Sequence, residues 1–445
     1  MHRLAEGPQQ VSRVAAMACG AHAMSREWPI AVRTVDVAAP IEAIHDVSGY
    51  PRTRIFVHEA GTLVGSVDIA NAGGPISATS LRQAIAGGLA WPLMRRAVER
   101  QIVAAPHPVP TYSVSIVIPT CNRPDDLRRC LSSLRSQRAY GRVEIVVVDN
   151  RPGGEATRSV AGEFPEVRLI EERRPGLSYA RNAGFVASSG DIAVAIDDDV
   201  TVPDGWLTRL LAPFARPEVM CVTGNVLPVA LDAESQCRFE AYGGLGKGFD
   251  PIEAGPDWFG SYRTAVPTWR LGATANAAFR RSIFSDPRIG LLDEALGAGM
   301  PTGCSEDTYL FYRILKAGFT IVYQPTAWVW HRHRVDQRSL RHQIFSYSKG
   351  HVAYQLTTLF REGDSRALVR LFYSLPKVYA VRIWERLRGR SEYPIPLITT
   401  EILGSLAGPL ALWQARRRVR RLGPSVRPQP HAVSLESQVA ETSAH

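Results

Sequence analysis

Short apolar segments alternate with amphipathic segments from residue 113 onward, and this rhythm limits the chain to few folds. Apolar strands are predicted at 114–118, 143–148, 167–170 and 191–196, with helices at 125–137 and 177–188 between them. Strands that are hydrophobic on both faces need helices on both sides of their sheet. The pattern therefore predicts an α/β fold with a mostly parallel sheet flanked by helices.

Three consecutive carboxylates, Asp197, Asp198 and Asp199, directly follow the last of these strands. Open α/β sheets bind their ligands at the carboxyl ends of the strands. Adjacent carboxylates repel each other at neutral pH, so a fold that keeps them needs a cation or hydroxyl donors opposite them. We interpret the triplet as a site for a divalent metal ion with a phosphorylated ligand. The alternative is a solvated turn that caps the next helix.

The chain of 445 residues is too long for a single average hydrophobic core, and changes in composition divide it into several regions. Residues 1–103 predict a small α+β accessory domain, with a hairpin formed by 54–58 and 62–68 and a helix at 80–89. A linker rich in Pro and Ala follows at 104–112. We predict a catalytic domain at 113–335, a helical basic region at 336–424 and a disordered tail at 425–445.

The net charge of +10 is concentrated near the C-terminus, where residues 331–424 hold 18 Arg and Lys against 6 Asp and Glu. No nucleic-acid-binding motif accompanies this charge, so nucleic acid is not expected as a partner. The six cysteines are scattered without a C-x-x-C pair, which is typical of reduced cytosolic thiols. The apolar run at 14–19 is too short for a signal-peptide core. These features predict a cytoplasmic protein.

Residues 394–413 have the length of a membrane span, but Glu401, three prolines and two glycines make the segment unsuited to the hydrocarbon core of a bilayer. Arginine clusters at 386–390 and 416–421 flank it. The pattern fits an interfacial segment on the anionic inner face of the cell membrane, and it fits a solvent-facing helix equally well.

Further polar residues stand at the ends of predicted elements. Asp149 follows a buried strand, as Asp197 does, and Glu306 and Asp307 open a predicted helix at 308–317. Taken alone, the latter pair fits electrostatic capping of the helix dipole. His331 lies at the exit of an apolar segment, where a lone histidine is more often structural than a ligand.

Six motifs in order and spacing give the chain a resemblance to family 2 glycosyltransferases with the GT-A fold. They lie at 114–123, 148–150, 180–184, 197–199, 272–281 and 305–307. The resemblance covers about residues 113–335, half of the chain. It implies transfer of a sugar from a nucleotide-sugar donor to a glycan or lipid-linked hydroxyl acceptor.

The resemblance also implies roles for individual residues. Asp199 and His331 would hold Mg²⁺ or Mn²⁺, which bridges the donor diphosphate. Asp307 would be the general base of an inverting displacement, and Glu306 would orient the site. Donor-binding roles fall to Pro119, Asn122, Arg123, Asp149, Arg181, Asp197 and Asp198. No Gln-x-x-Arg-Trp motif follows Asp307, so one sugar per encounter is expected rather than processive synthesis.

Two other functions stay open at this point. A sugar-1-phosphate nucleotidylyltransferase uses a related sheet, but it normally has a glycine-rich basic loop where this chain has Pro119 to Arg123. A catalytically silent glycan- or nucleotide-binding module is the other alternative. The presence of both Asp199 and Asp307 argues against such a module.

Overall fold

The computed structural model describes residues 28–102, 111–137 and 141–426. The predictions on the apolar run at 14–19, most of the linker and nearly all of the tail lie outside these residues. The predicted domain boundaries as such stay predictions.

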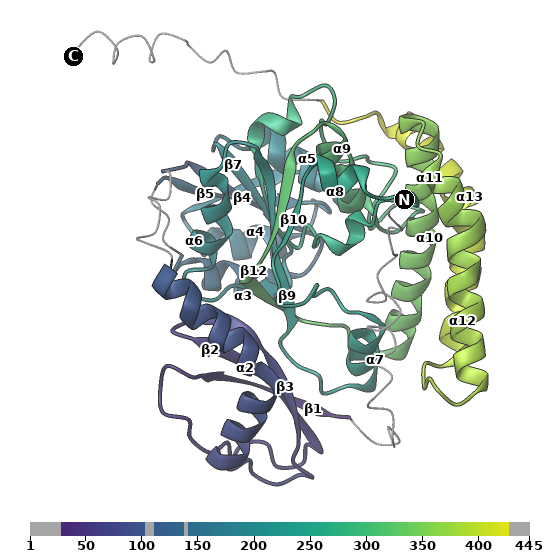
Figure 1. Ribbon diagram of the computed structural model, residues 1–445. Helices are drawn as coiled ribbons and strands as arrows, with labels where there is room; N and C mark the ends of the chain where they lie inside the picture. Colours follow the sequence, from purple (N-terminus) through teal and green to yellow (C-terminus); the bar gives the residue numbers. More distant parts are fainter. Residues whose placement is uncertain (1–27, 103–110, 138–140, 427–445) are drawn as a thin grey trace.

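A nine-stranded sheet forms the centre of the molecule (Figure 1). Its order is β10(Ile252–Ala254), β12(Thr320–His331), β9(Val219–Pro228), β11(Asn276–Arg280), β7(Ile192–Ile196), β4(Val114–Thr120), β5(Val143–Asp149) and β6(Val167–Glu171), with β8(Val200–Thr201) beside β12. The α/β class with a sheet flanked by helices is confirmed. Parallel pairing joins β7, β4, β5 and β6, and it also joins β12 to β9, whereas β11 is antiparallel to both of its neighbours.

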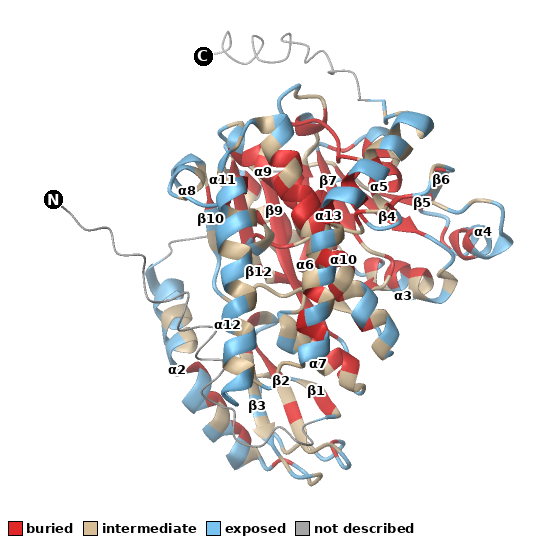
Figure 2. Ribbon diagram, turned by 90° about the vertical axis from the view of Figure 1, so that its right-hand side faces the viewer, coloured by how far each residue is buried: buried red, intermediate tan, exposed pale blue. Residues whose placement is uncertain are grey.

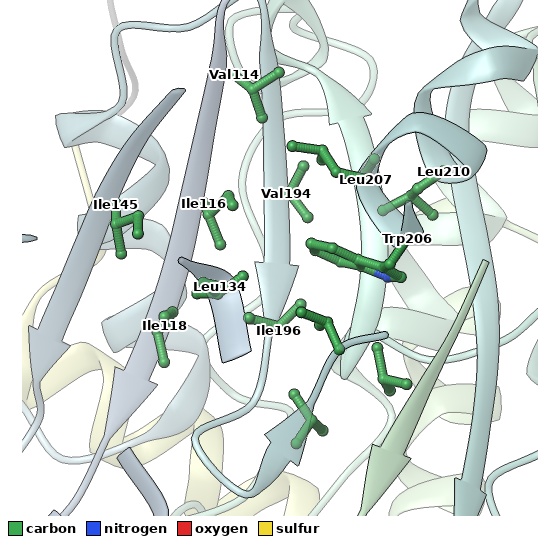
Figure 3. Close-up of a cluster of buried hydrophobic side chains, with 14 of the residues drawn as sticks. Val114, Ile116, Ile118, Leu134, Ile145, Val194, Ile196, Trp206, Leu207 and Leu210 are labelled. Atoms are coloured by element: carbon green, nitrogen blue, oxygen red, sulfur yellow. The ribbon is translucent and has the colours of Figure 1, made fainter. Parts of the chain in front are cut away.

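Alternation along β4 explains why the sheet needs cover on both faces. Val114, Ile116 and Ile118 pack on one side, and Val117 packs on the other. On the first side they meet Trp206, within α6(Trp206–Leu211), and residues of α3(Pro124–Leu134) (Figure 3). The second side is covered by α5(Leu177–Ala187) and α9(Glu306–Lys316). A further helix, α4(Glu155–Gly162), leads into β6.

Three predicted boundaries need correction. β4 continues through Pro119 to Thr120, because its pairing with β7 already ends at Val117 and the missing N–H of proline is tolerated there. The apolar segment before His331 is the second part of a longer strand, β12, which starts at Thr320 and has a register shift between Gln324 and Trp328. The first predicted helix, 125–137, ends at Leu134.

The N-terminal part has its own sheet, in which β1(Ile30–Asp36) pairs in parallel with β2(Arg52–Glu59). β2 and β3(Thr62–Ala70) form the predicted antiparallel hairpin. The predicted helix at 80–89 is longer in the structure, as α2(Ala78–Ile102), and covers this sheet over a separate small core. Phe56 and Leu63 contact Leu227 and Trp328 of the central sheet, which joins the two parts.

The helical C-terminal region consists of α10(Gln337–Glu362), α11(Arg366–Val369), a π-helical turn η4(Arg370–Ser374), α12(Leu375–Leu387) and α13(Ile395–Leu422). α13 lies along α10 (Figure 1). A side chain at Gly408 would stand 2.6 Å from Val352, so glycine permits this close packing. Within the described residues, α13 is the one helix that is long and apolar enough to cross a membrane, by length and composition only.

Candidate active site

The acidic triplet lies in the loop between β7 and β8, at the wall of a cavity of about 1750 Å³. The same cavity is lined by Arg181 of α5, by Glu306 and Asp307 of α9, and by His331 at the end of β12. These residues come from four elements that are far apart in the sequence. The acids of the triplet, Asp307 and His331 therefore border one cavity, whereas Asp149 does not line it.

Arg181 is the centre of the buried charge network. Its side chain is 2% exposed, and its guanidinium contacts Asp197 at 2.5 Å and Glu306 at 2.8 Å. A buried cation with two carboxylate partners fixes the geometry of all three groups, because leaving any one of them unpaired would be costly. The donor-binding role predicted for Arg181 is untested, but its position shows a structural role: it joins the triplet loop to the start of α9.

Glu306 and Asp307 differ sharply in environment. Glu306 is buried, and this burial, together with the charge of Asp307, raises the pKa of Glu306 although Arg181 opposes the shift. Asp307 is half-buried and lines the cavity, where its Oδ1 accepts the backbone N–H of Thr308 at 2.6 Å. Asp307 is thus the member of the pair with access to a ligand.

Hydrogen bonds hold the other two members of the triplet. Asp198 is buried, accepts the Thr120 hydroxyl at 2.7 Å and contacts Arg123 at 3.2 Å. Burial and the charge of Asp199 raise the pKa of Asp198 to about 7. Arg123 also contacts Asp199 at 2.8 Å, so it neutralises the triplet while it borders the cavity.

Asp199 and His331 form the pair that suits a cation. Asp199 Oδ1 is buried and accepts no hydrogen bond within the described part of the chain, and His331 Nε2 lies 3.3 Å away. Burial alone would raise the pKa of Asp199, but His331 and Arg123 outweigh it and lower that pKa. His331 Nδ1 lies 2.9 Å from His333 Nδ1, and His333 Nε2 lies 2.9 Å from Glu240, which orients the ring.

Asp199 and His331 fit a metal site that a bound molecule completes. No group of three or more His, Cys, Asp or Glu side chains placed to hold a metal occurs in the part of the chain that the structure describes. An ion held by Asp199 and His331 would therefore need further ligands from a bound molecule, as with a metal that bridges a diphosphate.

Comparison with known proteins identifies the domain that holds the acidic triplet. Residues 115–286 match the model for glycosyl transferase family 2. The chain contains a family 2 glycosyltransferase domain. It is 31% identical over 241 residues to the pre-mycofactocin glycosyltransferase of Mycobacterium tuberculosis, covering 53% of this chain and 47% of that protein. It is 29% identical over 271 residues to the succinoglycan biosynthesis protein ExoM of Rhizobium meliloti, covering 58% of this chain and 75% of that one.

The chain thus spans about half the length of the first of these relatives. Among solved structures, the mannosyltransferase PcManGT from Pyrobaculum calidifontis, in complex with GDP-Man and Mn²⁺, matches with 19% identity and a TM-score of 0.41. That match covers 81% of this chain and 90% of the other.

Two residues predicted to bind the donor do not line the cavity of the glycosyltransferase domain. Asp149 is buried at the end of β5, and its Oδ1 accepts the Arg151 N–H at 2.9 Å. Asn122 is exposed and adopts a left-handed backbone with φ of 57°. Pro119 and Arg151 do line the cavity. A hydrogen bond between Asp149 and a bound nucleotide sugar would require the carboxylate to turn away from its own loop.

Further residues that the motifs did not indicate also line the cavity. Among them are Lys247 of a loop, Trp269 of the 3₁₀ helix η2(Thr268–Arg270), His351 of α10 and Arg370 of η4. The last two lie beyond the matched residues 115–286 and reach the cavity only because α10 and α12 fold against it. No local sequence signal identifies them, because nothing in their neighbourhood marks a strand end or a helix start.

Proposed function

We propose that this protein is a metal-dependent, inverting glycosyltransferase that moves one sugar per encounter from a nucleotide-sugar donor to a hydroxyl acceptor. The acceptor would be a cell-envelope or lipid-linked glycan at the cytoplasmic face of the membrane. The observation that carries the proposal is that Asp307 and the Asp197–Asp198–Asp199 triplet, 108 or more residues apart in the sequence, border one cavity.

Asp307 is proposed as the general base. Its carboxylate takes the proton of the acceptor hydroxyl while that oxygen forms a bond to the anomeric carbon of the donor. The bond from this carbon to the diphosphate oxygen breaks on the opposite face, and the nucleoside diphosphate leaves with the electron pair. A single displacement of this kind inverts the anomeric configuration. The cavity exposure of Asp307, against the burial of Glu306, supports this assignment.

Asp199 and His331 are proposed to hold Mg²⁺ or Mn²⁺, and the unpartnered Asp199 oxygen supports this. Such an ion acts as a Lewis acid for the charge on a departing diphosphate. Around it, Arg123 keeps Asp198 and Asp199 in place, and Arg181 fixes the distance between the triplet loop and α9. These arginines act by positioning, since their guanidinium groups are already paired.

A thermal-shift screen of nucleotide sugars, each with and without Mn²⁺, tests the proposal on the full chain. A donor at about 100 times its dissociation constant should raise the melting temperature of a chain of this size by roughly 3 °C. We expect the shift from one nucleotide sugar to depend on Mn²⁺, and slow release of free sugar from that donor. If no nucleotide sugar stabilises the protein, but a nucleoside triphosphate with a sugar 1-phosphate yields pyrophosphate, the protein is a nucleotidylyltransferase instead.

A further inference from the structure

The cavity does not end at Asp307 but continues as an arm beneath the C-terminal helices. Tyr347 and His351, one turn apart on α10, form one wall, and Tyr379 and Arg382 of α12 form another. Trp269 connects this arm to the proposed base, because its neighbour Thr268 donates its hydroxyl to the carbonyl of Thr308 at 3.0 Å. We refer to this space, lined by Lys247, Trp269, Tyr347, His351, Arg370, Tyr379 and Arg382, as the acceptor arm.

Two cations of the acceptor arm have no carboxylate partner among the residues that the structure describes. The Arg370 guanidinium lies 5.2 Å from the Trp269 ring centre, and its Nε donates to His351 Nε2 at 3.1 Å. Burial, and then the nearby charge of Arg382, lower the pKa of Arg370 although Tyr379 opposes the shift. Lys247 borders the cavity without an ion pair, and burial lowers its pKa although Asp307 and Glu240 lie close enough to oppose the shift.

Three neighbouring arginines of the C-terminal region have carboxylate partners. Arg382 pairs with Glu401, Arg366 with Asp364, and Arg416 with Asp293. Both cations of the acceptor arm are partly buried, and an unpaired cation in such a place is costly unless an anion completes the site. The imidazole of His351, which accepts the hydrogen bond from Arg370, supplies no negative charge. It is neutral, because burial and Arg370 lower the pKa of His351 to about 3.

Large apolar side chains are exposed on the elements that line the acceptor arm. Phe372 and Tyr373, in the same π-helical turn as Arg370, are 78% and 63% exposed. Leu368, Val369, Trp384 and Leu387 are exposed on the adjoining α11 and α12, whose outward faces are largely solvent-accessible (Figure 2). An apolar patch next to an anion site is the arrangement that a phosphate group attached to a lipid chain requires.

We propose that the acceptor arm binds an acceptor that carries a phosphate group, held by Lys247 and Arg370, and that its lipid chain lies on the apolar surface of η4 and α12. This inference rests on the proposed function, since it names the acceptor class of the same cavity. Lys247 is the cation nearer to Asp307, and Arg370 lies farther along the arm, beside Trp269. The aromatic rings between them offer flat surfaces on which an attached sugar can stack.

Isothermal titration of the full chain with dodecyl phosphate, below its micelle concentration, tests the inference without knowledge of the natural acceptor. Charge-assisted hydrogen bonds contribute about 1.5–3 kcal/mol, so Arg370→Ala and Lys247→Ala should each weaken binding about 10-fold to 100-fold. Arg417→Ala is the matched control, because Arg417 also stacks on a tryptophan, Trp413 of α13, but does not line the cavity. It should bind dodecyl phosphate as the unchanged protein does.

Two further ligands identify which part of the probe is recognised. Dodecyl maltoside, which lacks the phosphate, should bind much more weakly, and so should inorganic phosphate, which lacks the chain. Equal binding of dodecyl maltoside, or equal binding of dodecyl phosphate by Arg370→Ala, would overturn the phosphate site. Equal binding of inorganic phosphate would overturn the proposal that the lipid chain lies on the apolar surface of η4 and α12.

The donor thermal shift is measured on the same variants. A retained Mn²⁺-dependent shift shows that Arg370→Ala is folded and has an intact donor site, so that a failure of the acceptor inference is separate from a failure of the proposed function. Absence of the donor shift in the unchanged protein would instead contradict the proposed function itself.

Discussion

The guanidinium of Arg181 donates a hydrogen bond of 2.8 Å to the buried carboxylate of Glu306. This contact joins α5 to the first turn of α9, and the other arm of the guanidinium holds Asp197. Consequently the acidic triplet and the proposed base keep a fixed separation before any ligand binds. Preorganisation of this kind lowers the cost of aligning reactants.

Arg181→Gln should reduce the free energy of unfolding by about 3–5 kcal/mol, because it leaves two carboxylates without their shared buried cation. Urea denaturation at pH 7 measures this. Arg158→Gln is a suitable control, since Arg158 makes a surface pair with Glu171 and its side chain is 65% exposed. The control should change the free energy by less than about 0.5 kcal/mol. Indistinguishable midpoints for the two variants would show that the Arg181 network does not hold the site.

Asp307→Asn should leave donor binding intact and lower the rate of transfer about 10²- to 10⁴-fold, the usual contribution of a general base. Donor binding is read from the Mn²⁺-dependent thermal shift, and transfer from release of nucleoside diphosphate in the presence of acceptor. Asp257→Asn, which changes an exposed aspartate in the first turn of α8(Pro256–Gly260), is the matched control. Transfer near the unchanged rate in Asp307→Asn would remove Asp307 from the mechanism.

Asp199→Ala should abolish the difference that Mn²⁺ makes to the donor thermal shift, and EDTA should do the same to the unchanged protein. The physical reason is that Asp199 is the carboxylate with an unpartnered oxygen beside His331. His331→Ala should weaken the metal effect without abolishing it, because the negatively charged ligand, Asp199, remains. Asp204→Ala, an exposed acid farther along the same segment, should behave as the unchanged protein. A donor shift that survives EDTA would rule out metal dependence.

The sequence predicted the parallel half of the sheet because β4, β5 and β7 are short and apolar on both faces, and their ends carry polar residues. That argument also placed Asp197 and Asp199 correctly at a strand end. It could not predict where a side chain turns: Asp149 stands at an equivalent strand end, yet its carboxylate accepts the N–H of its own loop. Strand position fixes the backbone, whereas local hydrogen bonds decide the direction of the side chain.

The other half of the sheet was less accessible to sequence reasoning. β12 contains Pro325 and a register shift, so its pattern breaks into two apparent segments. Arg370 lies 169 residues after Thr201, which ends the strand that follows the acidic triplet. It reaches the cavity only because α10 and α12 pack against the rest of the molecule. Long-range placement of this kind leaves no periodicity in the sequence.

The C-terminal helices are tied to the catalytic domain by Asp293, and this contact should make their docking sensitive to acid. Asp293 is 2% exposed and accepts two hydrogen bonds from Arg416 of α13, at 2.7 and 2.8 Å, and one from Arg361 of α10, at 3.1 Å. Burial alone would raise the pKa of Asp293, but the two arginines outweigh it and lower that pKa.

A carboxyl group whose pKa is lower in the folded state stabilises the fold above its unfolded pKa of about 4, and this contribution disappears as the pH falls through the folded value. Asp293→Asn should therefore cost about 3 kcal/mol at pH 7. The difference from the unchanged protein should stay constant down to about pH 5 and shrink below about pH 4. Asp286→Asn, which removes a surface partner of Arg288, is the control and should show no comparable loss at any of these values. Urea denaturation of the unchanged protein and the two variants at pH 7, 5 and 3.5 measures these free energies. A difference that does not shrink with acid would mean that Asp293 stabilises the fold by packing rather than by its charge.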